Sequence, residues 1–255
     1  VYEVVLVHAG AMIDEIPHLD RLDRSLEELR IDPPMGRMAL RAVLREVVRR
    51  NRIRTGLVYL QITRGVARRD HAFPTGVKPA LVVTAKRLTL PREETLESGV
   101  RVVTIEDIRW QRCDIKSVSL LPNVLGKQHA RENGAYEAWQ IDQDGNVTEG
   151  TSSNSWIVTH DDRLLTRAAT HEILNGITRQ TILKLAAARG LTFEERAFSL
   201  DEALAAREAF ISSATSFVTP VTQIDDTTLG NGRAGSFTMD LRSAYFDYMA
   251  TAAPV

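Results

Sequence analysis

Lys116 is the residue of this sequence whose surroundings best suit covalent chemistry. Lysine is scarce, since only five of the 32 basic residues are lysines, and a reaction that needs an amine therefore has few candidates. Residues 112–117 lead from an apolar strand into a helix whose start carries serines, and a lysine at such an edge loses hydration. Dehydration favours the neutral, nucleophilic amine, which can form a Schiff base with a carbonyl cofactor. Taken alone, a solvated surface lysine is the simpler interpretation.

An acid and two hydroxyl-rich turns could complete a site around this amine. Glu149 precedes the small, hydroxyl-rich residues 150–154, and residues 212–216 form a second turn of that kind. Residues 174–179 open a helix in which Thr178 and bare backbone N–H groups offer a seat for a phosphate. Together, the amine, the acid and the two turns would provide the contacts that pyridoxal phosphate needs. Each of them alone is more simply explained as a surface lysine, a turn glutamate or a helix cap.

Three other patterns resemble binding or catalytic motifs, but their sequence context argues against each. Residues 230–235 spell G-x-G-x-x-G, but only 20 residues follow, too few for a dinucleotide-binding unit, so we expect a turn between strands. Residues 150–154 lack the closing glycine of a nucleophile elbow. The six histidines show no metal-ligand spacing. Serine-hydrolase and metal chemistry are therefore not expected.

The composition is that of an ordinary globular protein, with 255 residues of which 44% are hydrophobic and 25% charged. No run approaches the roughly 18 apolar residues that span a bilayer, so no membrane partner is expected. One cysteine, Cys113, excludes an intramolecular disulfide and a cysteine-rich zinc site. The net charge of −1 gives no general attraction to nucleic acid. We expect a cytoplasmic protein without a nucleic-acid partner.

The first ninety or so residues alternate strand and helix patterns. The expected elements are a strand at 1–7, helices at 19–30 and 40–48, and strands at 57–63 and 80–85. Arginines line the outer face of the second helix, and a solvated face is favoured there over a nucleic-acid contact that would be salt-sensitive. Residues 64–74 form a cation-rich loop, and such loops often carry function.

A domain boundary is expected near residues 90–92, beyond which the pattern becomes β-rich. Strands are expected at 100–105, 136–141, 154–158, 164–165 and 210–211, and helices at 120–133, 178–189 and 237–250. Residues 142–146 are a strong turn signal between two of these strands. The mixture predicts two lobes of α/β and α+β type rather than one doubly wound sheet.

The same segments resemble the fold-type IV pyridoxal-phosphate enzymes, most closely the D-amino acid (D-alanine) aminotransferases. The matching segments are residues 1–5, 18–22, 61–65, 69–74, 106–110, 114–117, 147–150, 176–179 and 219–221. The resemblance implies an N-terminal α/β domain at 1–90 and a C-terminal, β-rich, cofactor-binding domain at 91–255. It also implies that about thirty residues precede the opening strand.

Three residues take the central cofactor roles that the resemblance implies. Lys116 matches the lysine that bonds covalently to pyridoxal 5'-phosphate and moves the substrate proton. Glu149 matches the acid that pairs with the pyridine nitrogen and keeps it protonated, so that the ring can accept electrons. Arg21 matches the arginine whose planar fork binds the phosphate.

Further cofactor contacts match positions in the C-terminal part. Ile177 and Thr178 match the backbone and hydroxyl contacts to the phosphate, and Leu174 matches the leucine packed on the ring. The second phosphate turn departs from the pattern, because Ala214 stands where the relatives usually have threonine. Thr215 is the expected substitute for that threonine.

The substrate is expected to be held by a separate set of residues. Tyr2, Arg69 and His71 match the tyrosine and the Arg-x-His loop that clamp the substrate carboxylate in the D-amino acid enzymes. In the family this loop comes from the other subunit, which implies a homodimer with shared sites. Without the other matches, a solvated cationic loop would be the preferred interpretation.

The expected function is transfer of the amino group from a D-amino acid such as D-alanine to a 2-oxo acid such as 2-oxoglutarate or pyruvate. The nearest alternatives of the same fold are a branched-chain L-amino acid aminotransferase and an aminodeoxychorismate lyase. A non-catalytic protein that keeps the cofactor for regulation is a further alternative, against which intact Lys116 and Glu149 weigh.

Overall fold

The computed structural model describes residues 1–89 and 96–253, in which the chain forms two compact units. The first unit comprises Val1–Thr89, Ile115–Val118 and Met249–Val255, and the second comprises Leu90–Asp114 and Ser119–Tyr248. The boundary expected at residues 90–92 lies outside the described residues. Lys116 therefore lies in a short segment of the first unit, Ile115–Val118, and the chain on either side of that segment belongs to the second unit.

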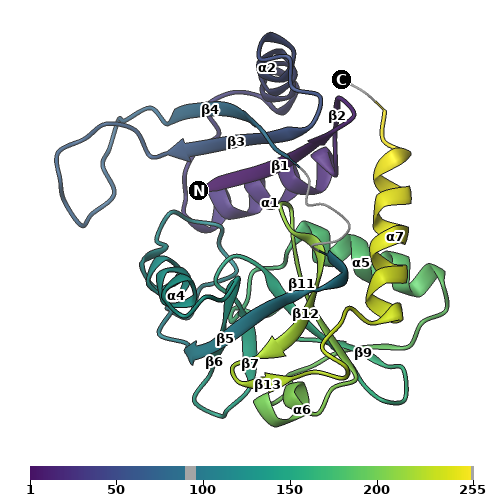
Figure 1. Ribbon diagram of the computed structural model, residues 1–255. Coiled ribbons are helices and arrows are strands. Elements are labelled where there is room, and N and C mark those ends of the chain that lie inside the picture. Colours follow the sequence, from purple (N-terminus) through teal and green to yellow (C-terminus); the bar gives the residue numbers. More distant parts are fainter. Residues whose placement is uncertain (90–95, 254–255) are drawn as a thin grey trace. The chain divides into compact units, whose positions relative to one another are not determined.

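The first unit is an antiparallel sheet with two helices beside it (Figure 1). The sheet order is β2 (Ala11–Met12), β1 (Tyr2–His8), β3 (Gly56–Thr63) and β4 (Ala80–Arg87), and the helices are α1 (Glu15–Glu28) and α2 (Arg37–Arg50). Burial alternates along β3, and Val58 and Leu60 on its covered face pack with Leu22 of α1 and Leu44 of α2. Each fully buried leucine contributes about 2 kcal/mol. The strands and helices predicted for this region are confirmed.

The first helix begins four residues earlier than the sequence pattern predicts. Its first turn contains Pro17, which a helix tolerates there because the first N–H groups have no intrahelical partner. Arg30, with a φ of 51°, lies in the left-handed region directly after the C-cap residue Leu29.

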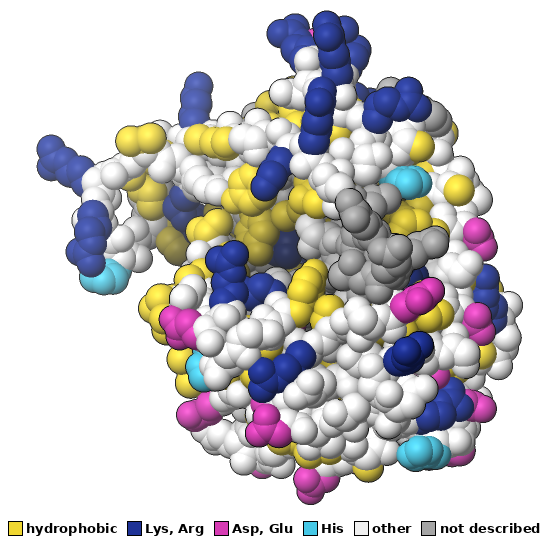
Figure 2. Space-filling view, viewed as in Figure 1, with side chains coloured by type: hydrophobic (Ala, Val, Ile, Leu, Met, Phe, Trp, Pro, Cys, Tyr) yellow, Lys and Arg dark blue, Asp and Glu magenta, His cyan; other side chains and the backbone are white. Residues whose placement is uncertain are grey.

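The arginines of α2 are paired with carboxylates of the same unit. Arg41 and Arg45 lie 2.9 and 3.2 Å from the carboxylate of Glu15, and two further arginines bind Glu46. Figure 2 shows these basic side chains standing out over α2. Exposed pairs of this kind contribute little to stability, as expected for a solvated charged face.

The second unit is built on a mixed sheet. Its main strand order is β10 (Phe193–Glu195), β9 (Leu164–Thr166), β8 (Asn154–Val158), β11 (Glu208–Ser213), β12 (Phe217–Ile224), β5 (Val100–Glu106), β6 (Glu137–Ile141) and β7 (Val147–Gly150), with β13 (Thr227–Thr228) paired to β12. The helices are α4 (Leu121–Glu132), α5 (Ile177–Ala188), α6 (Leu200–Leu204) and α7 (Ser236–Ala250). Trp139, Ile157, Phe198 and Ile211 form the centre of the core.

The turn predicted at residues 142–146 is confirmed, and it joins β6 to β7, a strand that was not predicted. Asp142 Oδ1 accepts hydrogen bonds from the backbone N–H groups of Asp144 at 3.0 Å and Asn146 at 2.8 Å. Strand β12 was not predicted, because Pro220 lies inside it and a proline weakens a strand pattern. Pro220 is nevertheless paired in register with Phe210 of β11.

Two expectations about local structure were wrong. The helix predicted at 120–133 is confirmed as α4, but Ser117 and Ser119 lie before its start, so Lys116 lies in an irregular loop instead of leading directly into a helix. Residues 230–235 join β13 to α7, not one strand to another.

The N-terminus of α7, which follows residues 230–235, is not a phosphate-binding site, because its N–H groups already have a partner. The carboxylate of Glu208 accepts the N–H groups of Phe237 at 3.1 Å and Thr238 at 2.8 Å. An added Cβ at Gly235 would lie 2.0 Å from Glu208 Cδ, so glycine is required by this carboxylate and not by a nucleotide. Across the described part of the chain, every helix is too short or too polar to cross a bilayer.

Candidate active site

Lys116 is held by the first strand of the first unit. The N–H of Tyr2 donates a 3.0 Å hydrogen bond to the Lys116 carbonyl, and Ile115 is buried in the core of that unit. Lys116 Nζ lies 4.5 Å from the centroid of the Tyr2 ring, which stacks on Tyr59 at 5.7 Å. Strand β1 therefore fixes the main chain of Lys116 and restricts its amine to the face of an aromatic ring.

The residue after Tyr2 positions Arg21. Glu3 is fully buried and accepts hydrogen bonds from Arg21 Nε at 2.8 Å and Nη2 at 2.7 Å. His18 Nδ1 lies 2.8 Å from Glu3 Oε2. Burial opposes ionisation, but the charge and hydrogen bonds of Arg21, with His18, lower the pKa of Glu3 to about 2. The planar guanidinium of Arg21 is thus fixed along one edge.

His18 completes this buried cluster as a neutral ring. Burial lowers its pKa below the usual value, although Glu3 acts in the opposite direction. An ionised Glu3 can only accept hydrogen bonds, so the neutral imidazole carries its proton on Nδ1. The cluster lies on α1 and β1, and neither Glu3 nor His18 was singled out from the sequence.

In the second unit, Glu149 is surrounded by N–H donors. Its Oε1 accepts from Arg109 Nη1 and from the backbone N–H of Leu174 at 3.1 Å. Its Oε2 accepts from Asn154 Nδ2 at 3.0 Å. The carboxylate is buried at the end of β7, and these donors stabilise its negative charge.

Arg109 is a functional candidate that the sequence interpretation missed. Its side chain is 5% exposed and forms two hydrogen bonds with Asp107, from Nε at 2.9 Å and from Nη2 at 2.7 Å. Burial alone would lower the pKa of Arg109, but Asp107 and Glu149 raise it above its usual range. The D-x-R spacing after β5 is the signal that could have identified it.

The start of α5 differs from the start of α7. Gly176 is its N-cap, no side chain forms a capping hydrogen bond to it in the described part of the chain, and Ile177 and Thr178 are buried. The first N–H groups of a helix have no intrahelical acceptor and attract anions. Leu174, whose N–H contacts Glu149, lies two residues before this N-cap.

Hydroxyl groups gather at the turn between β11 and β12. Ser213 Oγ accepts the N–H groups of Thr215 at 3.3 Å and Ser216 at 3.1 Å, and it lies 3.2 and 2.7 Å from their hydroxyl oxygens. Thr215 is exposed, and Ala214 has no hydroxyl to offer. The turn can therefore present hydroxyl groups despite the alanine.

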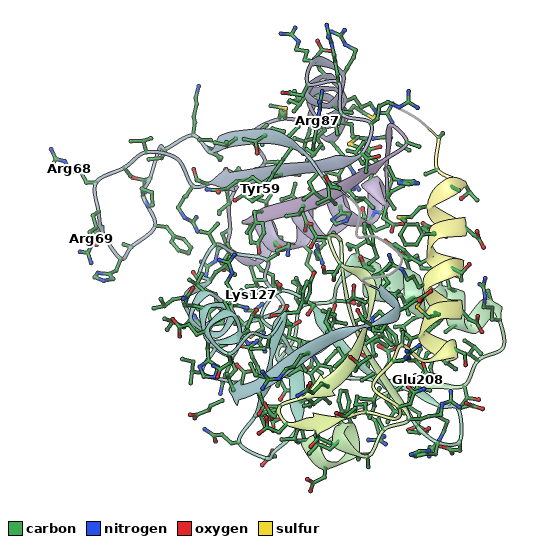
Figure 3. The ribbon with its side chains drawn as sticks, in the orientation of Figure 1. Tyr59, Arg68, Arg69, Arg87, Lys127 and Glu208 are labelled. Atoms are coloured by element: carbon green, nitrogen blue, oxygen red, sulfur yellow. The ribbon has the colours of Figure 1, made fainter. Side chains whose placement is uncertain are left out.

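The residues expected to hold the substrate are not brought together within one chain. Tyr2 is half-buried in the sheet, whereas Arg69 and His71 are exposed on the loop between β3 and β4. Figure 3 shows Arg69 at the tip of this loop, away from Tyr59, on which Tyr2 stacks.

The base of that loop is fixed. Arg64 donates hydrogen bonds to the carbonyls of Leu29 at 2.6 Å and Arg30 at 2.9 Å, at the end of α1. Its guanidinium carbon lies 3.7 Å from the centroid of the Phe73 ring. The loop is therefore anchored at its base while its basic tip stays exposed.

The polar groups of each unit can be described by the ligand chemistry that they suit. The first unit offers a lysine amine and a fixed arginine fork, and the second offers a buried carboxylate, an uncapped helix start and a hydroxyl turn. These groups match a carbonyl, a phosphate and a basic ring nitrogen.

Cys113 allows a local test of this electrostatic description. Burial raises the pKa of its thiol to about 11, with the charge of Arg109 acting against and that of Glu149 adding to the increase. Since the thiolate is the reactive form, alkylation by iodoacetamide at pH 8 should be about 100-fold slower than for a thiol with a pKa of 9. The rate should keep rising tenfold per pH unit up to pH 10, whereas a plateau near pH 9 would contradict the description. The denatured chain, with the same single cysteine, is the control.

Comparisons with known proteins give a consistent picture. The family model described as amino-transferase class IV matches residues 1–224. The D-alanine aminotransferase of Bacillus licheniformis is 43% identical over 244 residues, covering 96% of this chain and 85% of that protein. That of Staphylococcus aureus (strain MSSA476) is 40% identical over 250 residues, covering 98% and 88%. The branched-chain amino acid aminotransferase of T.th., solved with pyridoxamine 5'-phosphate, superposes with a TM-score of 0.91 at 25% identity, covering 100% and 86%.

Proposed function

This chain belongs to the class IV aminotransferases, and we propose that it transfers the amino group of a D-amino acid such as D-alanine to a 2-oxo acid such as 2-oxoglutarate or pyruvate. The observation that carries the proposal is the match of at least 40% identity, over nearly the whole chain, to two D-alanine aminotransferases. The chain is an enzyme of fold type IV that uses pyridoxal 5'-phosphate.

The proposal gives each of the polar groups described above a chemical role. When bound, pyridoxal phosphate supplies a carbonyl carbon for covalent attachment and a ring that accepts electrons. Lys116 would supply the amine that holds the cofactor through that carbon, with the carbonyl oxygen leaving as water, and would then move the proton to and from the substrate Cα. Glu149, held in place by its N–H donors, would supply the carboxylate that keeps the ring nitrogen protonated. Leu174 would supply an apolar contact for the ring.

An arginine, backbone N–H groups and hydroxyl groups are the proposed phosphate contacts. Arg21 presents the guanidinium edge opposite Glu3, and its orientation follows from the two hydrogen bonds to that buried carboxylate. Ile177 and Thr178 offer backbone N–H groups at the start of α5, and Thr178 adds a hydroxyl. Thr215 takes the place of the threonine that the relatives usually have in the second turn.

The substrate carboxylate is proposed to be bound by Tyr2 of one chain and by Arg69 and His71 of a second copy. The position of Arg69 on an exposed loop whose base is fixed by Arg64 supports this arrangement. The active form is then a homodimer with shared sites. A cytoplasmic location is part of the proposal and fits the single free thiol of Cys113.

Substituting Arg69 should weaken substrate binding more than turnover. Arg69→Ala removes a charged hydrogen-bond donor, so the KM for D-alanine should rise roughly 10- to 100-fold while kcat changes severalfold at most. Arg68→Ala, which removes a neighbouring exposed arginine of the same loop, is the matched control and should leave KM within about twofold. Equal KM values for the two variants would refute the assignment of Arg69.

Shared sites predict complementation between two variants, one without turnover and one with a raised KM. A mixed dimer of Lys116→Ala and Arg69→Ala subunits contains one site with both native residues, because each side chain comes from a different subunit. Refolding the two variants together should restore turnover with a KM near that of the native enzyme, whereas each refolded alone should not. Complementation that fails in dimers shown by native mass spectrometry to contain both variants would contradict the shared site.

The substrate alternatives are separated by acceptor dependence. With D-alanine and no 2-oxo acid, an aminotransferase releases one pyruvate per active site and stops, and 2-oxoglutarate restores continuous turnover with formation of D-glutamate. An aminodeoxychorismate lyase releases pyruvate from its own substrate continuously without an acceptor. A branched-chain L-amino acid aminotransferase, the activity named for the T.th. structure, is identified by preference for L-leucine over D-alanine.

A further inference from the structure

Asn154 occupies a position in the second unit where one side chain connects several parts of the proposed cofactor site. It is the first residue of β8 and is buried. Its Nδ2 donates two hydrogen bonds, to Glu149 Oε2 at 3.0 Å and to the carbonyl of Leu174 at 2.9 Å. Both N–H groups of the amide are thus directed to the acid and to the segment that precedes α5.

The oxygen of the same amide packs against the start of α5. An added Cβ at Gly176 would lie 2.2 Å from Asn154 Oδ1, closer than any real contact. The backbone of Gly176, with φ −60° and ψ 138°, is one that any residue can adopt. Glycine is therefore required here by the close approach of Asn154 and not by backbone conformation.

The backbone of Asn154 adds a fourth connection. In the register of β8 with β11, Asn154 is paired with Ser212, the residue before the hydroxyl turn that begins at Ser213. Trp156 Nε1 donates a 2.8 Å hydrogen bond to Ser212 Oγ, which fixes that strand further. Asn154 thus joins the acid, the segment at Leu174, the helix start and the strand of the second turn.

We propose that Asn154 is a positioning residue that sets the carboxylate of Glu149 at a fixed distance from the start of α5. A rigid ligand with a ring nitrogen at one end and a phosphate at the other then meets both partners at once. An amide suits this role because it supplies two donors and no charge, whereas an aspartate would place a second negative charge beside Glu149. This inference rests on the proposed function.

A double-mutant cycle tests the proposal with pyridoxal 5'-phosphate as the probe. Asn154→Ala should raise its dissociation constant at least about tenfold, since hydrogen bonds to a charged group are lost. It should also make the ring nitrogen of ¹⁵N-labelled bound cofactor lose its proton at a lower pH. Gly176→Ala should have the same two effects, because the added methyl group displaces the amide. In the Asn154→Ala background, Gly176→Ala should raise the dissociation constant of the cofactor by less than a further factor of about two.

Asn123→Ala is the matched control. Asn123 Nδ2 donates a 2.8 Å hydrogen bond to the carbonyl of Thr151, in the turn between β7 and β8, so the variant loses an amide hydrogen bond beside Glu149 without touching it. It should change neither readout by more than about twofold. If Asn154→Ala does not fold, Gly176→Ala with Asn154 in place still decides the question.

The inference would be overturned by equal effects of Asn154→Ala and Asn123→Ala, or by an effect of Gly176→Ala on the dissociation constant that is the same in both backgrounds. An unchanged titration of the ring nitrogen in Gly176→Ala would do so too. A native enzyme that binds the cofactor but does not convert D-alanine contradicts the proposed function alone, because the cycle is still measurable. A native chain that does not bind the cofactor overturns both.

Discussion

Replacing Lys116 by alanine is expected to reduce turnover of D-alanine by at least about a thousandfold and to abolish covalent attachment of the cofactor. The loss combines two effects, because the amine both bonds to the cofactor and moves the substrate proton, and a positioned acid–base group alone contributes roughly 10²- to 10⁴-fold. Turnover is measured by coupled pyruvate formation. Attachment is measured by borohydride reduction, followed by mass spectrometry of the peptide that contains residue 116.

The chain offers a matched lysine for this experiment. Lys127 is half-buried on α4 (Figure 3), donates a 2.6 Å hydrogen bond to the carbonyl of Tyr136 and lies 3.4 Å from Glu137 Oε1. Lys127→Ala should keep turnover within about twofold of the native value and should retain the modified peptide at Lys116. Cofactor trapped on any other lysine in the native enzyme would show that the covalent role of Lys116 is wrong. Because Tyr2 hydrogen-bonds to the main-chain carbonyl of Lys116, the alanine variant should keep its fold.

Glu149→Gln is expected to lower kcat at least about a hundredfold. Glutamine keeps the size of the side chain but removes the charge that stabilises a protonated ring nitrogen, so the ring accepts electrons less readily. It also leaves the buried Arg109 with one carboxylate partner, Asp107, in place of two. The bound cofactor should then lose its ring proton at a lower pH than in the native enzyme. Both kcat and this titration are followed on the same samples.

Glu208→Gln is the control for Glu149→Gln, because it removes a buried carboxylate that has no proposed contact with the cofactor. Glu208 is buried in the same unit and caps α7 through the N–H groups of Phe237 and Thr238. Its substitution should lower the free energy of unfolding by about 1 kcal/mol, as for loss of a helix cap, with kcat nearly unchanged. Glu149→Asp, which keeps a shorter charged side chain, should retain more activity than Glu149→Gln. A kcat for Glu149→Gln within about tenfold of the native value would exclude the proposed role.

Local signals made much of the fold predictable. Alternating burial in β3, the apolar stripe of α2 and the Asp142 turn each depend on residues close together in the sequence. Lys116 was proposed from the scarcity of lysine and Glu149 from its place before a hydroxyl-rich turn, and the resemblance implied a role for each. The errors were also local, since Pro220 masks a strand and the serines after Lys116 imitate a helix start.

The supporting residues could not be predicted, because their roles depend on contacts between distant segments. Glu3 meets Arg21 across 18 residues, and Arg109 meets Glu149 across 40. Asn154 gains its importance only when β7, β8 and the start of α5 are brought together. Taken alone in the sequence, each of these residues is of a type that is ordinary for a strand or a turn.

The most direct test of the central proposal is the ratio of kcat/KM for D-alanine to kcat/KM for L-leucine, measured on the native enzyme with 2-oxoglutarate as acceptor. A site built to place one enantiomer for proton transfer at Lys116 should favour D-alanine at least about a hundredfold. Pyruvate and D-glutamate should form in equal amounts. A ratio below one would contradict the proposal and identify a branched-chain L-amino acid aminotransferase instead.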